Sequence, residues 1–134
     1  MKFNEATVRI LVRKDYGACF DFYKEKLGLV PTGGDRNGVY TSFSMGEGEP
    51  ACLAIFAGKE MSKYKGYEQP TMTTQPDTVV TTIPTDDFAA DYQRLKEAGI
   101  EFIGEPQFIP GWEMTCVYFR DPEGNLFELM DGYA

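Results

Sequence analysis

Two charged residues lie inside apolar, strand-like segments of this chain, and both kinds of side chain can do chemistry. Arg9 lies in Thr7–Val12 (TVRILV), and Glu128 lies in Asn125–Met130 (NLFELM). The glutamate could act as a general base or hold a ligand cation, and the arginine could clamp a carboxylate or phosphate through two parallel hydrogen bonds. Because a buried carboxylate needs a partner, the plainer alternative is that Glu128 pairs with Arg9 or is solvated.

Other catalytic chemistries lack the residues that they need. The chain has no histidine, so a nucleophile–histidine triad cannot form. Cys19, Cys52 and Cys116 show neither disulfide nor metal-ligand spacing, which predicts small buried residues in a reducing compartment. The pair Asp86-Asp87 suits a helix start, where such residues are favoured in any case.

The composition indicates a small globular protein with an acidic surface. The 134 residues suit one domain, and the hydrophobic fraction of 43% and aromatic fraction of 14% suffice for a core and an aromatic-lined cavity. The net charge of −8 disfavours nucleic acid and anionic membrane surfaces as partners. It either serves solubility alone or favours a cationic or neutral small molecule. No apolar segment predicts a signal peptide or membrane span, so a cytoplasmic protein is expected.

The first half of the chain predicts a strand followed by a helix. Thr7–Val12 is rich in β-branched and aliphatic residues. Asp15 is the expected N-cap and Gly28 the expected end of the helix. The apolar stripe between them has helical spacing and consists of Tyr16, Phe20, Tyr23 and Leu27.

The second half repeats this pattern. A strand is expected over Thr78–Ile83, and a helix begins after Asp87 and ends at Gly99. Its stripe is Phe88, Tyr92 and Leu95. The offset is 71 residues for the strands, from Thr7 to Thr78, and 72 for the stripes, from Tyr16 to Phe88. These stripes are interpreted as helix core.

Three strands are expected after each helix. They are 29–32, 39–45 and 51–56 in the first half, and 100–108, 113–120 and 125–130 in the second. The prediction is therefore an α+β chain of two β-α-β-β-β modules, module one over about 1–58 and module two over about 77–134. Residues 59–76 between them have no periodic apolar pattern and are interpreted as a surface linker, or else as one wall of a site.

This duplicated chain resembles the vicinal oxygen chelate superfamily, which includes glyoxalase I, extradiol dioxygenases and bleomycin resistance proteins. The most specific matching segments are Phe22-Tyr23 with Leu27-Gly28, and 119–129 (FRDPEGNLFEL). The resemblance covers nearly the whole chain. It implies a single domain, 1–134, whose two modules form a curved, eight-stranded mixed sheet around a cavity with the helices outside. It also implies a homodimer.

In metal-using members of that family, four side chains from the first and last strands of the two modules bind the metal. The resemblance places these positions at Thr7, Ala54, Thr78 and Glu128. Zinc, nickel and iron need imidazole or carboxylate ligands, and alanine and threonine supply neither. We therefore expect no metal site and no cofactor.

Strand alternation predicts what would line the cavity instead. Residues two apart share a face, so Arg9 is expected beside Thr7, and Met130 beside Glu128. Trp112 follows Pro110-Gly111 and is expected either to stack on a ligand at the rim or to pack at a sheet edge or dimer interface. The predicted ligand-binding residues are Arg9, Tyr40, Phe56, Trp112, Tyr118, Glu128 and Met130.

Three functions compete on this basis. The first is a metal-independent protein that binds a small organic molecule, such as a drug or natural product that it sequesters. The second is a metal-independent lyase or isomerase in which Glu128 is the catalytic acid or base. The third, a metal-dependent glyoxalase or dioxygenase, is disfavoured by the ligand positions. Fold alone does not choose among them.

Overall fold

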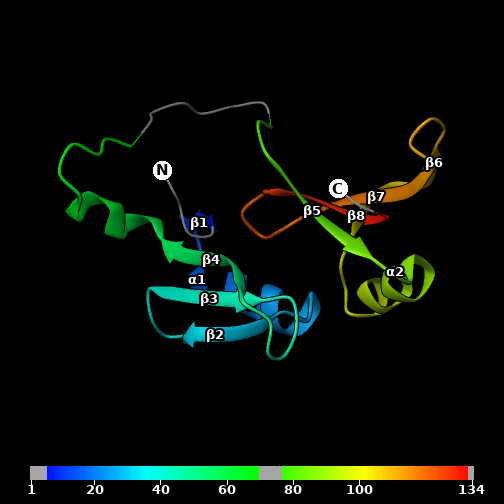
Figure 1. Ribbon diagram of the computed structural model, residues 1–134. Coiled ribbons are helices and arrows are strands. Elements are labelled where there is room, and N and C mark those ends of the chain that lie inside the picture. Colours follow the sequence, from blue (N-terminus) through cyan, green and yellow to red (C-terminus); the bar gives the residue numbers. More distant parts are fainter. Residues whose placement is uncertain (1–5, 70–76, 133–134) are drawn as a thin grey trace, which may run out of the picture. The chain divides into compact units, whose positions relative to one another are not determined.

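The computed structural model describes residues 6–69 and 77–132 (Figure 1). The chain divides into two compact units, residues 1–71 and 72–134, and each contains one four-stranded mixed sheet. The predicted α+β class and the repeated β-α-β-β-β module are confirmed, with the eight strands shared equally between two sheets. The extent of a single domain over 1–134 stays a prediction.

Module one contains the sheet order β1-β4-β3-β2. β1 runs parallel to β4, and the other two pairs are antiparallel. A helix follows β1, as expected. The bounds are β1 (Val8–Val12), α1 (Tyr16–Asp21), η1 (Phe22–Lys26), β2 (Val30–Gly34), β3 (Tyr40–Ser44) and β4 (Ala51–Ala57).

The first helix begins where the sequence predicts but changes its winding halfway. The Asp15 side chain accepts a hydrogen bond from the Ala18 amide at 3.0 Å, as an N-cap should. The second half, η1, is a π-helix, and the Leu27 amide donates to the Phe22 carbonyl at 2.8 Å. The wider turn buries Phe22 as well as Tyr23, so the expected stripe is incomplete.

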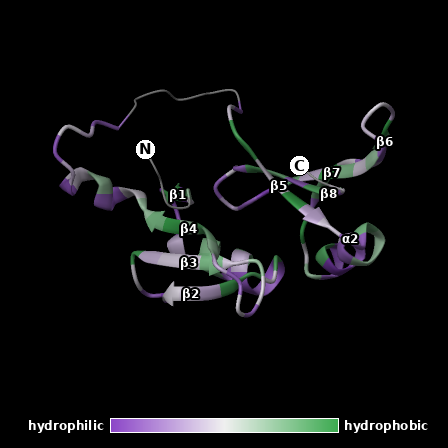
Figure 2. Ribbon diagram, viewed as in Figure 1, coloured by the Kyte–Doolittle hydropathy of each residue, from purple (hydrophilic) through white to green (hydrophobic). Residues whose placement is uncertain are grey.

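The core of module one lies between this helix and one face of the sheet. Phe43 on β3 is fully buried, with ring centroids 5.9 Å from Phe20 and 5.7 Å from Tyr23. Burial of such a ring stabilises the fold by about 2–3 kcal/mol. β4, the central strand that these elements cover, consists entirely of apolar residues and is green in Figure 2.

Module two repeats this architecture, with the sheet order β5-β8-β7-β6. β5 runs parallel to β8, and the other pairs are antiparallel. β5 begins two residues later than the expected Thr78. The bounds are β5 (Val80–Thr85), α2 (Phe88–Glu97), β6 (Phe102–Ile109), β7 (Met114–Arg120) and β8 (Leu126–Asp131).

A chain of aromatic rings forms the core of module two. Phe119 and Phe127 are fully buried and stack with centroids 5.3 Å apart. Phe102 contacts Phe119 at 5.6 Å and Tyr92 of α2 at 4.8 Å. The turn before β8 is fixed by Asp121, which accepts hydrogen bonds from the backbone of the two residues Glu123 and Asn125 and from the Asn125 side chain.

The segment expected to be a plain linker begins with ordered structure. A 3-10 helix, η2 (Gly58–Lys63), follows β4 directly. An ion pair between Lys63 and Glu60 and a hydrogen bond from Ser62 to the Lys59 carbonyl support it. These interactions are local and polar, so they leave no apolar periodicity in the sequence. Residues 70–76 of the expected linker lie outside the described residues.

Candidate functional site

One face of module one carries the residues that strand alternation predicted to line a cavity. In the sheet, Arg9 on β1 pairs with Ala54 on β4, and Ala54 pairs with Ser42 on β3. The next such row joins Leu11, Phe56 and Tyr40 in the same way. Since directly paired residues share a face, these two rows lie on the side opposite the helix-covered core. Three predicted ligand-binding residues, Arg9, Tyr40 and Phe56, are therefore together.

The Arg9 guanidinium lies against two aromatic rings on this face. Its central carbon is 5.4 Å from the centroid of Tyr40 and 5.3 Å from that of Phe56. The two rings meet edge to face, with centroids 6.2 Å apart. Arg9 is exposed, Tyr40 is 37% exposed and Phe56 is 9% exposed. The rings thus hold an accessible cation by cation–π attraction.

The corresponding face of module two carries a carboxylate. Glu128 on β8 pairs with Thr82 on β5 and with Tyr118 on β7. Met130 pairs with Pro84 and Cys116 one row further on. The predicted ligand-binding residues Tyr118, Glu128 and Met130 are therefore together on one face.

Glu128 is a buried carboxylate with partners inside its own module. It is 6% exposed, and the Tyr118 side chain is hydrogen-bonded to it. That hydrogen bond, together with burial and the nearby negative charge, raises the pKa of Tyr118 to about 12. Burial and the charge of Glu128 also raise the pKa of the Cys116 thiol. A neutral phenol and a neutral thiol therefore face the carboxylate at pH 7.

These partners were missed by sequence reasoning, which considered only Arg9 or solvent for Glu128. Tyr118 and Cys116 were each predicted to face inward, but their contact with Glu128 depends on the pairing of β7 with β8. Among the described residues, no buried side-chain nitrogen or oxygen lacks a hydrogen-bond partner. Glu128 needs no further partner to be stable where it lies.

The sheet pairing corrects one of the four positions taken from the family resemblance. Arg9 stands beside Ala54, and Thr82 stands beside Glu128, so the first strands of the modules are offset by 73 residues (from 9 to 82) and not by 71. The counterpart of Thr7 is then Val80. The equivalence of Thr7 with Thr78 was wrong because β5 begins at Val80, two residues later than the sequence pattern suggested.

The corrected positions do not fit a transition metal. They hold Thr7, Ala54, Val80 and Glu128, which together offer one carboxylate, and Tyr118 already donates to it. Within residues 6–69 and 77–132, no group of three or more histidine, cysteine, aspartate or glutamate side chains is arranged to hold a metal ion. Zinc, nickel and iron centres need several imidazole, thiolate or carboxylate donors, so the donor set disagrees with the metal chemistry of such folds.

Trp112 lies in the turn between β6 and β7 and is 77% exposed. The residues on either side of it, Gly111 and Glu113, have left-handed backbone conformations, with φ of +91° and +51°. This turn presents the indole to solvent in place of packing it into the module. The side chain is therefore free to contact a ligand or another protein surface, as its loop position suggested.

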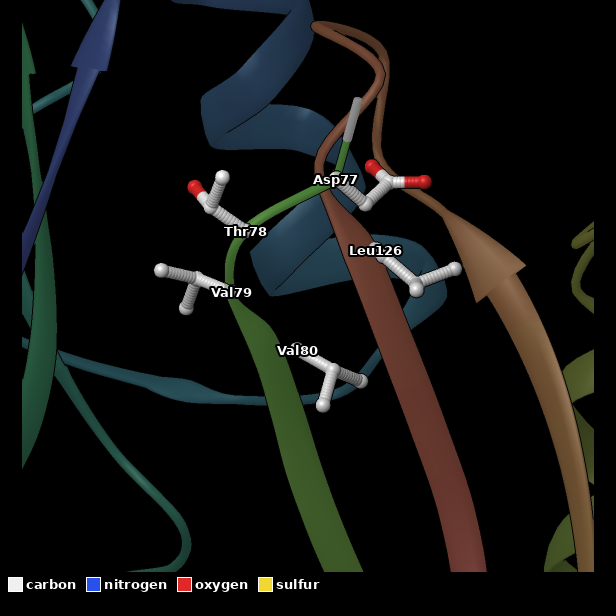
Figure 3. Close-up of a pocket in the computed structure, with 5 residues that line it drawn as sticks. All are labelled: Asp77, Thr78, Val79, Val80 and Leu126. Carbon is white, nitrogen blue, oxygen red and sulfur yellow. The ribbon is translucent and has the colours of Figure 1, made fainter. Parts of the chain in front are cut away.

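The described residues also form an open cavity of about 240 Å³ at the start of β5 (Figure 3). Its walls are Asp77, Thr78, Val79, Val80 and Leu126. The acidic wall is occupied, because Asp77 forms an ion pair with Arg120 at 2.7 Å that lowers the pKa of the carboxyl group. None of the seven predicted ligand-binding residues lines this cavity, so it is not the site that the sequence predicts.

Comparison with known proteins supports the assignment that the modules suggest. Residues 3–129 match the Glyoxalase/Bleomycin resistance protein/Dioxygenase superfamily. The uncharacterized protein YraH of Bacillus subtilis (strain 168) is 28% identical over 127 residues, covering 91% of this chain and 93% of YraH.

Solved structures agree. A glyoxalase/bleomycin resistance protein/dioxygenase from Nocardioides has a TM-score of 0.72 and 26% identity, over 98% of this chain and 85% of that one. A lactoylglutathione lyase from Agrobacterium tumefaciens has a TM-score of 0.66 and 22% identity, over 96% and 95% of the two chains, which shows a shared fold. This chain belongs to the glyoxalase/bleomycin resistance protein/dioxygenase superfamily.

Proposed function

We propose that this chain is a metal-independent protein that binds a small organic molecule, with sequestration of a drug or natural product as its role. The observation that carries the proposal is the set of side chains at the corrected positions, Thr7, Ala54, Val80 and Glu128. A protein of this superfamily with one available carboxylate, already hydrogen-bonded, lacks the ligands for metal-assisted catalysis.

The two faces supply what a small-molecule site requires, which is apolar area with a few placed polar groups. In module one these are the rings of Tyr40 and Phe56 with Arg9. In module two they are Met130 with the pair Tyr118 and Glu128, and Trp112 is exposed in the adjoining turn. We propose these seven residues as the ligand contacts, with a cationic or hydrogen-bond-donating group of the ligand directed at Glu128.

The remaining partners are proposed on weaker chemistry. No helix within the described part of the chain combines the length and apolar character that membrane crossing requires. The net charge of −8 opposes binding to nucleic acid. β1 and β5 are edge strands of their sheets and expose Val8 and Val80, which a second copy could cover. We propose a cytoplasmic homodimer, which light scattering at micromolar concentration would test.

The test is a thermal-shift screen of metabolites, antibiotics and other natural products, followed by calorimetry of each stabilising compound. Glu128→Gln keeps the side-chain shape and removes the charge, so binding of a cationic ligand should weaken by about 1.5–3 kcal/mol. Phe108 is also exposed in module two and was not predicted to contact ligand, so Phe108→Ala is a matched control for Trp112→Ala. A screen without stabilising compounds would overturn the proposal.

A metal-independent enzyme is the second candidate, and the environment of Glu128 favours it over other activities. The carboxylate shares a hydrogen bond with a phenol whose pKa is about 12, which pairs a base with a weak acid on one sheet face. An enzyme would convert its ligand in the presence of a chelator and lose that turnover in Glu128→Gln. A sequestering protein would return the compound unchanged.

A further inference from the structure

Arg9 differs from other arginines of this chain in what it contacts. Arg36, Arg94 and Arg120 each pair with a carboxylate, from Asp21, Asp91 and Asp77. Arg9 instead lies over the rings of Tyr40 and Phe56, and no carboxylate of the described residues lies within ion-pair distance of it. Aromatic rings attract the cation but leave its in-plane N–H donors unoccupied.

The rings also limit how the guanidinium can move. Two nearly equal distances, 5.4 and 5.3 Å, place it between the two ring centroids, on a side chain anchored in β1. A free arginine loses about 2 kcal/mol of side-chain entropy when it is fixed on a ligand. Here the rings have already restricted the side chain, so part of this cost does not fall on ligand binding.

The floor beside Arg9 is open and ends in hydroxyl groups. Its row continues through Ala54 to Ser42 and Gly33, where the side chains are small. The Ser42 and Thr32 hydroxyls are 2.7 Å apart and hydrogen-bonded to each other. Two strand spacings separate Arg9 from Ser42, about 10 Å. That distance suits a small, flat molecule lying across β4.

We propose that this face of module one is a subsite for an organic acid, a carboxylate attached to a flat apolar body. The guanidinium of Arg9 binds the carboxylate through two parallel hydrogen bonds, and Tyr40 and Phe56 contact the body. The Ser42 hydroxyl lies at the far end, where a polar substituent of the ligand reaches it. The inference names the class of ligand for the proposed binding function, and it rests on that function.

The charges favour an anion here although the protein as a whole is acidic. The two rows of this face contain a guanidinium and no carboxylate, since their other members are Leu11, Tyr40, Ser42, Ala54 and Phe56. A guanidinium in direct contact with a carboxylate gains about 1–4 kcal/mol near a protein surface. The remaining charges act over longer distances and are screened beyond about 8 Å at physiological ionic strength. The direct contact therefore decides which ligand binds.

Three probes that share one ring test this assignment. Benzoate, benzamide and benzamidinium are titrated into the isotopically labelled protein, and the backbone amide shifts are followed by NMR. We expect benzoate to move the resonances of residues 9, 40, 42 and 56, with benzamide at least about 10-fold weaker because it lacks the charge. Stronger shifts by benzamidinium at these residues would overturn the proposal.

Variants identify the group that reads the charge. Arg9→Gln should weaken benzoate about 10- to 100-fold, and Arg9→Lys should recover part of that loss because it keeps the charge without the planar fork. Arg94→Gln is the matched control, since Arg94 is exposed on α2 and lies on no predicted site. Benzoate binding that is equally weakened by Arg94→Gln, or unchanged by Arg9→Gln, would contradict the assignment.

The outcome separates this inference from the proposed function. If the screen finds stabilising compounds but benzoate leaves residues 9, 40, 42 and 56 unmoved, the subsite is wrong and the binding function stands. If benzoate binds at Arg9 while no larger compound stabilises the protein, the subsite stands and the sequestering function is wrong.

Discussion

The two modules share one strand order, yet they carry opposite charges on equivalent strand pairs. Module one has Arg9 on its first strand beside Ala54 on its last. Module two has Thr82 on its first strand beside Glu128 on its last. The cation is exposed over two rings, whereas the carboxylate is buried and hydrogen-bonded to Tyr118.

This difference shows that the third strand of each row decides what the charge can do. Beside Ala54 that strand supplies Ser42, a small residue that leaves the Arg9 side of the sheet open. Beside Glu128 it supplies Tyr118, whose phenol reaches the carboxylate. A buried carboxylate is stable only with such donors, and an exposed guanidinium needs none. We therefore expect substitutions in module two to affect stability most and those in module one to affect binding most.

The largest expected effect is a loss of stability at high pH that depends on Tyr118. Its pKa of about 12 in the folded protein lies above the ordinary 10.0, so the folded state holds the phenolic proton more tightly. This contribution is complete below pH 10 and disappears as the pH rises to 12. The expected loss is about 2–3 kcal/mol. Urea unfolding at pH 9, 10, 11 and 12 measures it.

The matched variant isolates the tyrosine responsible. Tyr118→Phe should show a flatter dependence of unfolding free energy on pH over this range. Tyr40→Phe should keep the wild-type slope, because Tyr40 contacts a cation and an aromatic ring and no carboxylate. If both variants have the wild-type slope, the hydrogen bond to Glu128 does not control this titration.

The same pair of variants distinguishes the modules at pH 7. Tyr118→Phe removes a donor from a buried carboxylate and should lower the free energy of unfolding by about 1.5–2 kcal/mol. Tyr40→Phe removes an exposed hydroxyl and should change it by less than about 0.5 kcal/mol. Circular dichroism in a urea series measures both. Equal losses would remove the distinction between a buried and an exposed polar group.

The smallest expected effect concerns the stability that Arg9 provides. Arg9→Ala should lower the free energy of unfolding by about 0.5–1 kcal/mol, the range for an exposed cation–π contact. Arg94→Ala, which breaks an exposed ion pair at 3.6 Å, should cost less than about 0.5 kcal/mol. The same urea series measures both values. A loss at Arg9 of 2 kcal/mol or more would mean that the residue is part of the stabilising core.

Most of the fold could be predicted from the sequence because its signals are local. Seven of the eight strands begin within two residues of the prediction, and β5 also does so, with Val80 against Thr78. Asp15 and Asp87 cap their helices as expected. The π-helical turn and η2 were missed, since both depend on hydrogen bonds that leave no pattern of apolar residues.

The candidate site was less predictable because it depends on strand pairing. Alternation placed Arg9 and Glu128 on the correct faces, but it could not say which residues stand beside them. A two-residue difference in the start of β5 moved one expected position from Thr78 to Val80. The contact of Tyr118 with Glu128 and the position of Arg9 over Tyr40 both require the pairing across two neighbouring strands.

The most direct test of metal-independent binding is the affinity of one compound from the screen, measured by calorimetry in three states of the same protein. These are the protein as purified, after treatment with a chelator, and after addition of one equivalent of zinc, nickel or iron(II). We predict one dissociation constant in all three states, because the corrected positions offer a single, already hydrogen-bonded carboxylate. Binding that is lost on chelation and restored by one of these metals would contradict the account.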